Sequence, residues 1–181
     1  MAVLPVLVYP DSRLKKVSAP VDLEDESLAG LIEDLLETMN SSPGCIGIAA
    51  PQCDIHKRLI VVDVSRNPNM KQKHGLMILI NPELLSQSGK NTAREGCLSL
   101  PHLTANVTRA KRISVKATNR EGSEVIIDAS GFEARAILHE MDHLDGILFL
   151  DRVSSLKTDV FRRKRYLTGT EDSDQGGQAG S

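Results

Sequence analysis

The feature that most constrains this chain is the run His139-Glu140-Met141-Asp142-His143, an HExxH sequence. It lies within a helix that we predict from Gly131 to Gly146, where glycine suits the position just after the last helical residue. Residues four apart share one helix face, so both imidazoles can reach a single metal ion. Glu140 flanks them and can take a proton from a water held by that ion. The alternative is a helix that happens to have two surface histidines, but an HExxH match arises by chance in only roughly one chain of this length in a hundred or two, and a helical context makes it rarer.

A third ligand is needed, because two histidines alone rarely hold a catalytic metal tightly. In zinc peptidases this ligand lies downstream, as a third histidine or as a glutamate on a following helix. Here Phe149 occupies the histidine position, and the only glutamate after His143 is Glu171 in a polar tail. Both peptidase patterns therefore lack a ligand, and the donor must lie upstream.

The upstream candidates are three cysteines and three histidines: Cys45, Cys53, Cys97, His56, His74 and His102. Cys97 is favoured, because Gly96 and Pro101 indicate a tight backbone rather than a strand interior, and such a segment can approach an ion closely. The other two cysteines suit small buried side chains, and the three histidines lie in polar surroundings. An odd cysteine number without a signal sequence predicts reduced thiols and a cytoplasmic protein.

Length and composition predict one globular domain. The chain has 181 residues, of which 40% are hydrophobic and 25% charged. We predict a single catalytic domain over residues 1–167 and a disordered polar tail over residues 168–181. A net charge of −2 disfavours DNA as a partner. No apolar run approaches the roughly 20 residues that span a bilayer, so no membrane association is expected.

The predicted elements mix helices with strands that pair in hairpins. Asp11 is expected to cap a short helical turn through Lys16. Apolar spacing predicts a helix over 25–39. Apolar runs predict buried strands over 59–64 and 76–80, and alternation predicts strands over 113–118 and 124–129. Asn81-Pro82 is expected to stop the second strand, and residues 119–122 to form the turn between the last two. This order predicts an α+β fold rather than repeated βαβ units.

Three ordered segments resemble the signature motifs of the peptide deformylase family. They are CIGIAAPQ at 45–52, EGCLS at 95–99 and HEMDH at 139–143, and the similarity covers about residues 5–165. The resemblance implies antiparallel or mixed sheets around a central helix that carries the HExxH run. It also implies an enzyme that hydrolyses the N-terminal formyl group of N-formyl-methionyl nascent polypeptides and releases formate.

The same resemblance implies roles for particular residues. One divalent metal, ferrous iron in the native enzyme and replaceable by zinc, nickel or cobalt, would be bound by Cys97, His139 and His143. Glu140 would transfer protons, and the Gln52 amide and the Leu98 backbone N–H would stabilise the oxyanion. Substrate contacts are expected from Ile46, Gly47 and Arg109. Glu95 and Asp142 are candidate carboxylates for orienting a ligating histidine, although Asp142 equally suits a solvated helix face.

The chain departs from the family pattern at three positions. Cys45 stands where glycine is usual, Leu138 where glutamine is common, and Thr104 where an arginine is often found. These positions concern substrate contacts more than the metal. The basic run at 162–165 could contact the ribosome transiently, or it could be a solvated surface. A structural metal module is the main rival function, but such a site has no need of Glu140.

Overall fold

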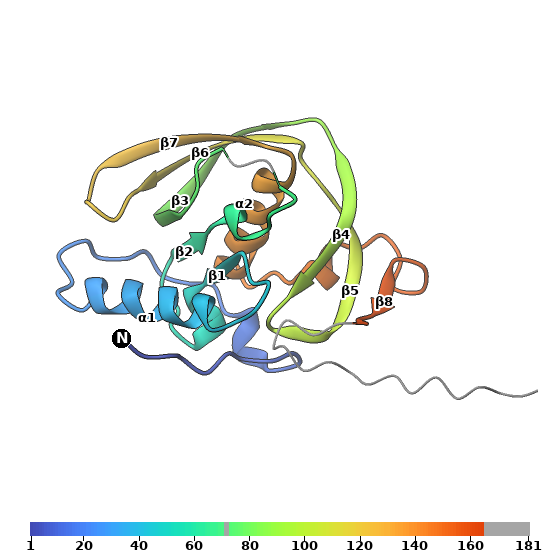
Figure 1. Ribbon diagram of the computed structural model, residues 1–181, viewed down its shortest axis with the longest axis horizontal. Helices are drawn as coiled ribbons and strands as arrows, with labels where there is room; N and C mark the ends of the chain where they lie inside the picture. The colour runs from blue at the N-terminus through green and yellow to red at the C-terminus, as the bar shows by residue number, and fades with distance from the viewer. Residues whose placement is uncertain (71–72, 165–181) are drawn as a thin grey trace, which may run out of the picture.

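Two antiparallel sheets flank one central helix in the computed structural model, which describes residues 1–70 and 73–164 (Figure 1). The larger sheet has the order β1-β2-β3-β6-β7. Its strands are β1 Gly47–Ala49, β2 Leu59–Val62, β3 Met77–Ser88, β6 Arg112–Thr118 and β7 Glu124–Ser130. The smaller sheet, β4-β5-β8, consists of β4 Asn91–Cys97, β5 Leu100–Arg109 and β8 Val160–Arg162. The predicted α+β fold is confirmed.

Two α-helices accompany the sheets: α1 Leu28–Asn40 and α2 Gly131–Leu144. Short 3₁₀ turns are η1 Ser12–Lys15, η2 Ala50–Cys53, η3 Val64–Arg66 and η4 Phe149–Arg152. Asp11 caps η1 as predicted, since its carboxylate accepts the Arg13 N–H at 3.0 Å. Among the described helices, none is long and apolar enough to cross a bilayer.

The fully buried strand β2 divides the core between the two helices. Ile60 and Val62 point toward α2 and belong to one apolar cluster, whereas Leu59 and Val61 belong to the cluster beside α1. This is the alternation expected of a strand with both faces covered. A third cluster lies below the smaller sheet and includes Cys97 and Phe149. The central helix is therefore held on one side by β2 and its neighbours.

The N-terminal segment ties η2 to the turn after β4. The Leu7 N–H donates to the Gln52 carbonyl at 2.7 Å, and the Tyr9 N–H donates to the Ser99 carbonyl at 2.7 Å. The end of α2 is held from the same side, because the Ser18 N–H donates to the Leu144 carbonyl at 2.8 Å. Three segments far apart in the sequence are thus fixed relative to one another.

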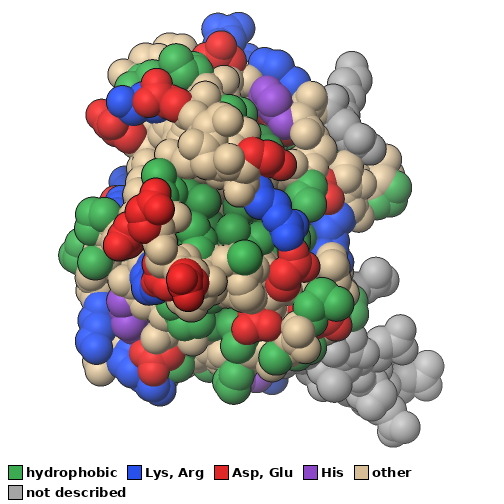
Figure 2. Space-filling view, turned by 90° about the vertical axis from the view of Figure 1, so that its left-hand side faces the viewer, with side chains coloured by type: hydrophobic (Ala, Val, Ile, Leu, Met, Phe, Trp, Pro, Cys, Tyr) green, Lys and Arg blue, Asp and Glu red, His purple; other side chains and the backbone are tan. Residues whose placement is uncertain are grey.

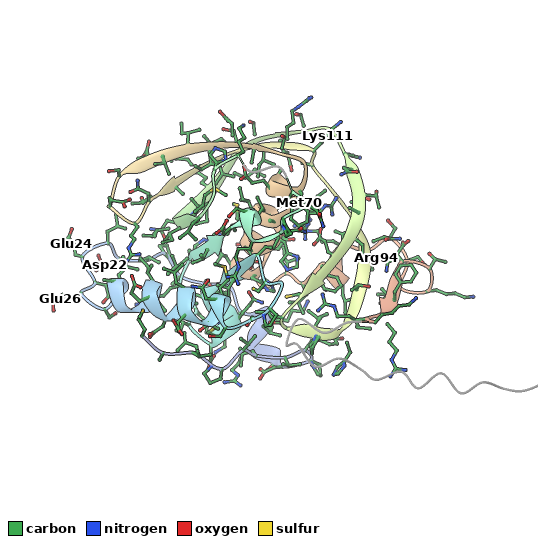
Figure 3. All side chains as sticks on the ribbon, viewed as in Figure 1. Asp22, Glu24, Glu26, Met70, Arg94 and Lys111 are labelled. Atoms are coloured by element: carbon green, nitrogen blue, oxygen red, sulfur yellow. The ribbon has the colours of Figure 1, made fainter. Side chains whose placement is uncertain are left out.

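The face of the molecule shown in Figure 2 is hollowed. Hydrophobic side chains gather at the bottom of this hollow and acidic side chains around it (Figure 2). Asp22, Glu24 and Glu26 lie at one end of the molecule, whereas Arg94 lies at the opposite end, beside β4 and β5 (Figure 3).

The structure confirms the predicted hairpin and corrects the strand before it. β6 and β7 pair with Thr118 opposite Glu124, and Gly122 in the turn has φ +82°. Asn81-Pro82 does not stop β3, because Asn81 takes a φ of +50° within a register shift and the strand resumes to Ser88. A β-bulge of this kind absorbs a proline that would otherwise break the ladder.

Two further expectations concern the C-terminal half. The sequence pattern does not predict β4, β5 or β8, because β4 is rich in polar residues and because Gly96 and Pro101 indicate a tight backbone rather than a strand interior. The predicted tail, residues 168–181, lies outside the described residues, and so does the domain boundary at 167.

Candidate metal centre

The structure brings together the three residues that the sequence nominated as ligands. His139 and His143 lie one turn apart on α2, with ring centroids 5.2 Å apart. Cys97 ends β4, and its Sγ lies 3.3 Å from Nε2 of His143. One ligand atom from each residue lies within 4.8 Å of the others, and all three residues are buried. A thiolate and two imidazoles this close suit a single late transition metal.

Cys97 reaches this position through a tight turn between β4 and β5. Glu95 pairs with Ala105, the register then shifts, and Cys97 pairs with Leu100, which leaves Leu98 and Ser99 in the turn. The tight backbone expected around Cys97 is present, but it joins two strands instead of lying in an irregular segment. The strand end presents the thiol toward α2.

Glu95 orients His139. Its Oε1 accepts a hydrogen bond from Nδ1 of His139 at 2.8 Å, which turns Nε2 toward the cysteine. Arg109 donates to both oxygens of the same carboxylate at 2.7 and 2.9 Å, and Arg135 donates to Oε2 at 2.6 Å. Burial would raise the pKa of Glu95, but the hydrogen bonds from His139 and Arg109 outweigh it and lower the pKa. We call these four residues the Glu95 cluster.

Asp142 supports the Glu95 cluster from behind. Its Oδ2 accepts from Nη1 of Arg109 at 2.8 Å and from Nε of Arg152 at 2.7 Å, so it is not a solvated residue. Arg109 is only 6% exposed, and its guanidinium faces these two carboxylates. This placement gives no support to the direct substrate contact predicted for Arg109, and it assigns the residue to the support of Glu95.

Glu140 lies buried beside the ligands, and burial raises its pKa to about 7. Its Oε2 has no hydrogen-bond partner among the described residues. A Cβ built on Gly47 would lie 2.8 Å from Oε1 of Glu140. The absence of a side chain at Gly47 therefore makes room for the glutamate, in addition to the close approach of the loop backbone expected from the sequence.

The pKa values of the two histidines are shifted in opposite directions. Burial lowers the pKa of His143, so its ring is neutral near pH 7 and keeps a lone pair for a metal. Burial also acts to lower the pKa of His139, but hydrogen bonds with Cys97 and Glu95 raise it instead. The proton on Nδ1 of His139 is thus held by Glu95.

Gln52 lies on η2 with its amide fixed at both ends. Its Oε1 accepts the Ala49 N–H at 2.9 Å, while Nε2 donates to Oγ of Ser99 at 3.1 Å and approaches Sγ of Cys97 at 3.4 Å. The amide hydrogens therefore point toward the thiolate side of the centre, which is where an oxyanion donor is needed.

A cavity of about 240 Å³ opens over these residues. Its walls include Ile46, Gly47, Gln52, Leu98 and Glu140, which the sequence had nominated. Cys45, one of the departures from the family pattern, also lines it, and burial raises the pKa of its thiol to about 12. This thiol is therefore neutral and behaves as a small apolar wall residue. Leu138 packs against the larger core cluster and not in the cavity.

Several cavity residues carried no signal in the sequence. Phe132 and Arg135 fall within the family similarity but had no assigned role, while Arg94 and Arg163 come from β4 and from the segment after β8. Thr104 lies beside Arg94, whose Nη1 donates to its hydroxyl at 3.3 Å. Phe132 and Arg135 reach the cavity from α2, whereas the pairing of β4, β5 and β8 brings Arg94 and Arg163 to it.

Fold and site together define the class: a buried base beside an open three-ligand centre belongs to a metal-dependent hydrolase. A family model described as polypeptide deformylase matches residues 3–159. The chain belongs to the peptide deformylase family. It is 46% identical over 164 residues to the peptide deformylase of Thermodesulfovibrio yellowstonii, covering 91% of this chain and 97% of that relative.

Solved structures of peptide deformylases share the fold. The Legionella pneumophila enzyme aligns with a TM-score of 0.77 at 39% identity, over 86% of this chain and 89% of its own. The Ehrlichia chaffeensis enzyme in complex with actinonin gives 0.79 at 37% identity, over 87% and 92%. The chain is accordingly a peptide deformylase by family, and it hydrolyses the N-terminal formyl group of N-formyl-methionyl polypeptides.

Proposed function

We propose that Cys97, His139 and His143 hold one divalent metal ion and that Glu140 moves the protons of formyl-amide hydrolysis. The observation that carries this proposal is the buried cluster of three ligand atoms within 4.8 Å, two of whose residues, Cys97 and His139, line the cavity. The donor set suits Fe²⁺, Zn²⁺, Ni²⁺ and Co²⁺, and the family resemblance favours Fe²⁺ as the native ion. When bound, such an ion lowers the pKa of a water and polarises the formyl carbonyl.

Glu140 is suited to both proton transfers. A carboxyl whose pKa is raised to about 7 by burial can accept the proton of the attacking water and then donate it to the departing amine nitrogen. Gly47 leaves its Oε1 free of steric contact, and Oε2 has no competing partner among the described residues. Glu95 keeps His139 in the tautomer whose Nε2 faces the centre.

Gln52 and Leu98 supply the proposed oxyanion donors. The amide of Gln52 is held by Ala49 and Ser99, so its orientation costs no rearrangement when the negative charge develops. The Leu98 N–H lies in the turn that follows Cys97 and lines the same cavity. Gln52 and Leu98 both line the cavity beside Cys97, so their donors would act on the same carbonyl oxygen.

The apolar part of the cavity is the proposed site of the methionine side chain. Ile46 and Gly47 line it, together with Leu98, Phe132 and Ala136. The Acinetobacter baumannii relative, solved with Met-Ala-Ser bound, aligns with a TM-score of 0.77 at 36% identity, over 84% of this chain and 99% of its own. That complex supports a peptide partner for the present cavity.

Location and ribosome contact belong to the same proposal. We place the enzyme in the cytoplasm, where newly made polypeptides begin. A transient ribosome contact through the basic run 162–165 stays a prediction, and its last residue lies outside the described part of the chain. Arg163 lies against Gly96, so only part of the run can face an RNA surface. If charge reversal at Arg162 and Lys164 leaves ribosome binding unchanged, the contact does not exist.

Anaerobic purification followed by metal analysis and a formyl-Met-peptide assay tests the mechanism. Glu140→Gln should keep the metal and lose about 100- to 10,000-fold in kcat, the usual range for general acid–base catalysis. Cys97→Ser should lose or exchange the metal. Cys53→Ser is the matched control, because Cys53 is also buried but does not line the cavity. Full activity with Glu140→Gln, or unchanged metal content with Cys97→Ser, would overturn the proposal.

A further inference from the structure

The segment after β8 inserts an arginine into the cavity. The Arg163 N–H donates to the His102 carbonyl at 2.9 Å, which continues the β5–β8 pairing by one residue. Its side chain lies flat against Gly96: a Cβ built there would be 1.7 Å from Nη2 and 2.8 Å from Cζ. Gly96 immediately precedes the ligand Cys97, so the guanidinium lies beside the metal centre.

This guanidinium lacks the partners that the other cavity arginines have. Arg135 donates to Glu95, to the Val107 carbonyl and to the Asn91 carbonyl. Arg94 donates to Asn106 and Thr104 and lies 3.7 Å from the Phe161 ring centroid. In the described part of the chain, Nη1 of Arg163 is buried and has no hydrogen-bond partner. A buried donor without an acceptor is costly, so an acceptor supplied by a ligand would be strongly favoured.

The charge at this end of the cavity favours an anionic acceptor. Arg94 and Arg163 both line the cavity, and the hydrogen bonds of Arg94 go to neutral groups. Arg94 lies beside β4 and β5, at the end opposite to the acidic residues near α1 (Figure 3). A carboxylate forms charge-assisted bonds about twice as strong as those of a neutral carbonyl. The Arg guanidinium also presents two parallel N–H groups that match a carboxylate.

We propose that Arg163 is a specificity-determining residue that binds an acidic side chain on one of the two residues following formyl-methionine. The inference rests on the proposed function, because it takes the cavity as the peptide site. With the formyl carbon at the metal centre and the methionine in the apolar wall, an extended peptide advances about 3.3 Å per residue. The next side chains therefore pass Gly96 and the guanidinium that covers it.

C-terminally amidated formyl peptides test the inference without a free terminal carboxylate. We would compare formyl-Met-Glu-Ala-Ser-amide and formyl-Met-Ala-Glu-Ser-amide with their glutamine counterparts. The wild-type enzyme should favour glutamate at one of the two positions by about 10-fold in kcat/KM, expressed in KM and reduced by added salt. Arg163→Gln should bring this ratio to about 1, and Arg163→Lys should retain part of it.

Lys157→Gln is the charge-matched control, because Lys157 is exposed on the same C-terminal segment and does not line the cavity. It should leave the glutamate-to-glutamine ratio unchanged. A wild-type ratio near 1 at both positions, or a ratio that survives Arg163→Gln, would overturn the inference. An equal loss on both peptides would also overturn it, since this means a contact with the peptide backbone only.

The glutamine peptides separate this inference from the proposed function. Their hydrolysis and its loss in Glu140→Gln depend on the metal centre and not on Arg163. If the glutamine peptides are hydrolysed and the preference is missing, only the specificity inference fails. If Glu140→Gln hydrolyses both peptides at the wild-type rate, the proposed function fails first.

Discussion

The two halves of the metal centre are built in different ways. The α2 half places His139, Glu140 and His143 on one helix, where a single turn sets their spacing. The β4–β5 half places Cys97 at a strand end, 46 residues from His143, through a bulged hairpin and the Glu95 cluster. Local geometry suffices for the first half, whereas the second depends on buried charges and strand pairing. The centre should therefore be most fragile where it depends on distant contacts.

The largest loss of stability is expected in the β4–β5 half, from Glu95→Gln. This change leaves the buried Arg109 and Arg135 guanidinium groups without their shared carboxylate, and breaking such a buried pair costs about 3–5 kcal/mol. Urea unfolding at pH 7 measures the loss. Glu121→Gln, at the exposed β6–β7 turn, is the control and should stay within about 0.5 kcal/mol of wild type. A small change in both variants would show that the Glu95 cluster does not stabilise the fold.

The same variant has a pH signature. Because the pKa of Glu95 is lowered in the folded protein, its contribution is fully present above the unfolded value of about 4.3 and is lost as the pH falls through the folded value. The difference in unfolding free energy between wild type and Glu95→Gln should be constant near neutral pH and begin to shrink below about pH 4.3. A difference that grows on acidification contradicts this assignment.

The α2 half has its own weak point at its C-terminal end. Gly146 follows the helix with φ +69°, and a Cβ there would lie 2.3 Å from the Lys15 carbonyl oxygen. Gly146→Ala should cost about 3 kcal/mol in unfolding free energy, from left-handed strain plus steric overlap. Gly122→Ala has φ +82° but no atom within 4 Å of the added carbon, so it should cost about 1 kcal/mol. Equal losses would mean that the contact with Lys15 is unimportant.

The contact between β1 and Glu140 of the α2 half can be tested at Gly47. An alanine would push Oε1 of Glu140, now 2.8 Å from the built Cβ, out of position. We expect kcat/KM to fall about 100-fold, equivalent to about 2.7 kcal/mol, with little change in metal content. Gly30→Ala on the exposed face of α1 has no atom within 4 Å of the added carbon and should leave activity unchanged. Wild-type kinetics in Gly47→Ala would show that Glu140 tolerates displacement.

The smallest loss of unfolding free energy is expected at Arg152, the exposed partner of Asp142. Arg152 pairs with Asp142, but its side chain is 43% exposed, so Arg152→Gln should cost no more than about 1 kcal/mol. Arg109 binds the same carboxylate, but its side chain is only 3% exposed. Arg109→Gln should therefore cost several times more unfolding free energy than Arg152→Gln. Thermal unfolding of the two variants compares them, and equal shifts would contradict the contrast between buried and exposed partners.

Periodicity and turn chemistry were sufficient for the locally encoded elements. The apolar spacing before Met39 predicted α1, the alternation around residues 119–122 predicted the β6–β7 hairpin, and Gly146 was placed correctly just after α2. These patterns succeed because helix and hairpin geometry repeat every few residues. The HExxH spacing belongs to the same kind of information.

The sequence by itself thus determined the fold class, the α2 half of the centre and, through three ordered motifs, the family. The tertiary structure alone decided that Asn81 is accommodated in a bulge, that Arg109 supports Glu95 behind the cavity, and that Arg163 enters the cavity from the segment after β8. The physical reason is the sequence separation over which each interaction acts. Helix and turn preferences act between residues that are near neighbours in the chain. Burial and the pairing of charges depend on strands that meet only after the chain has folded.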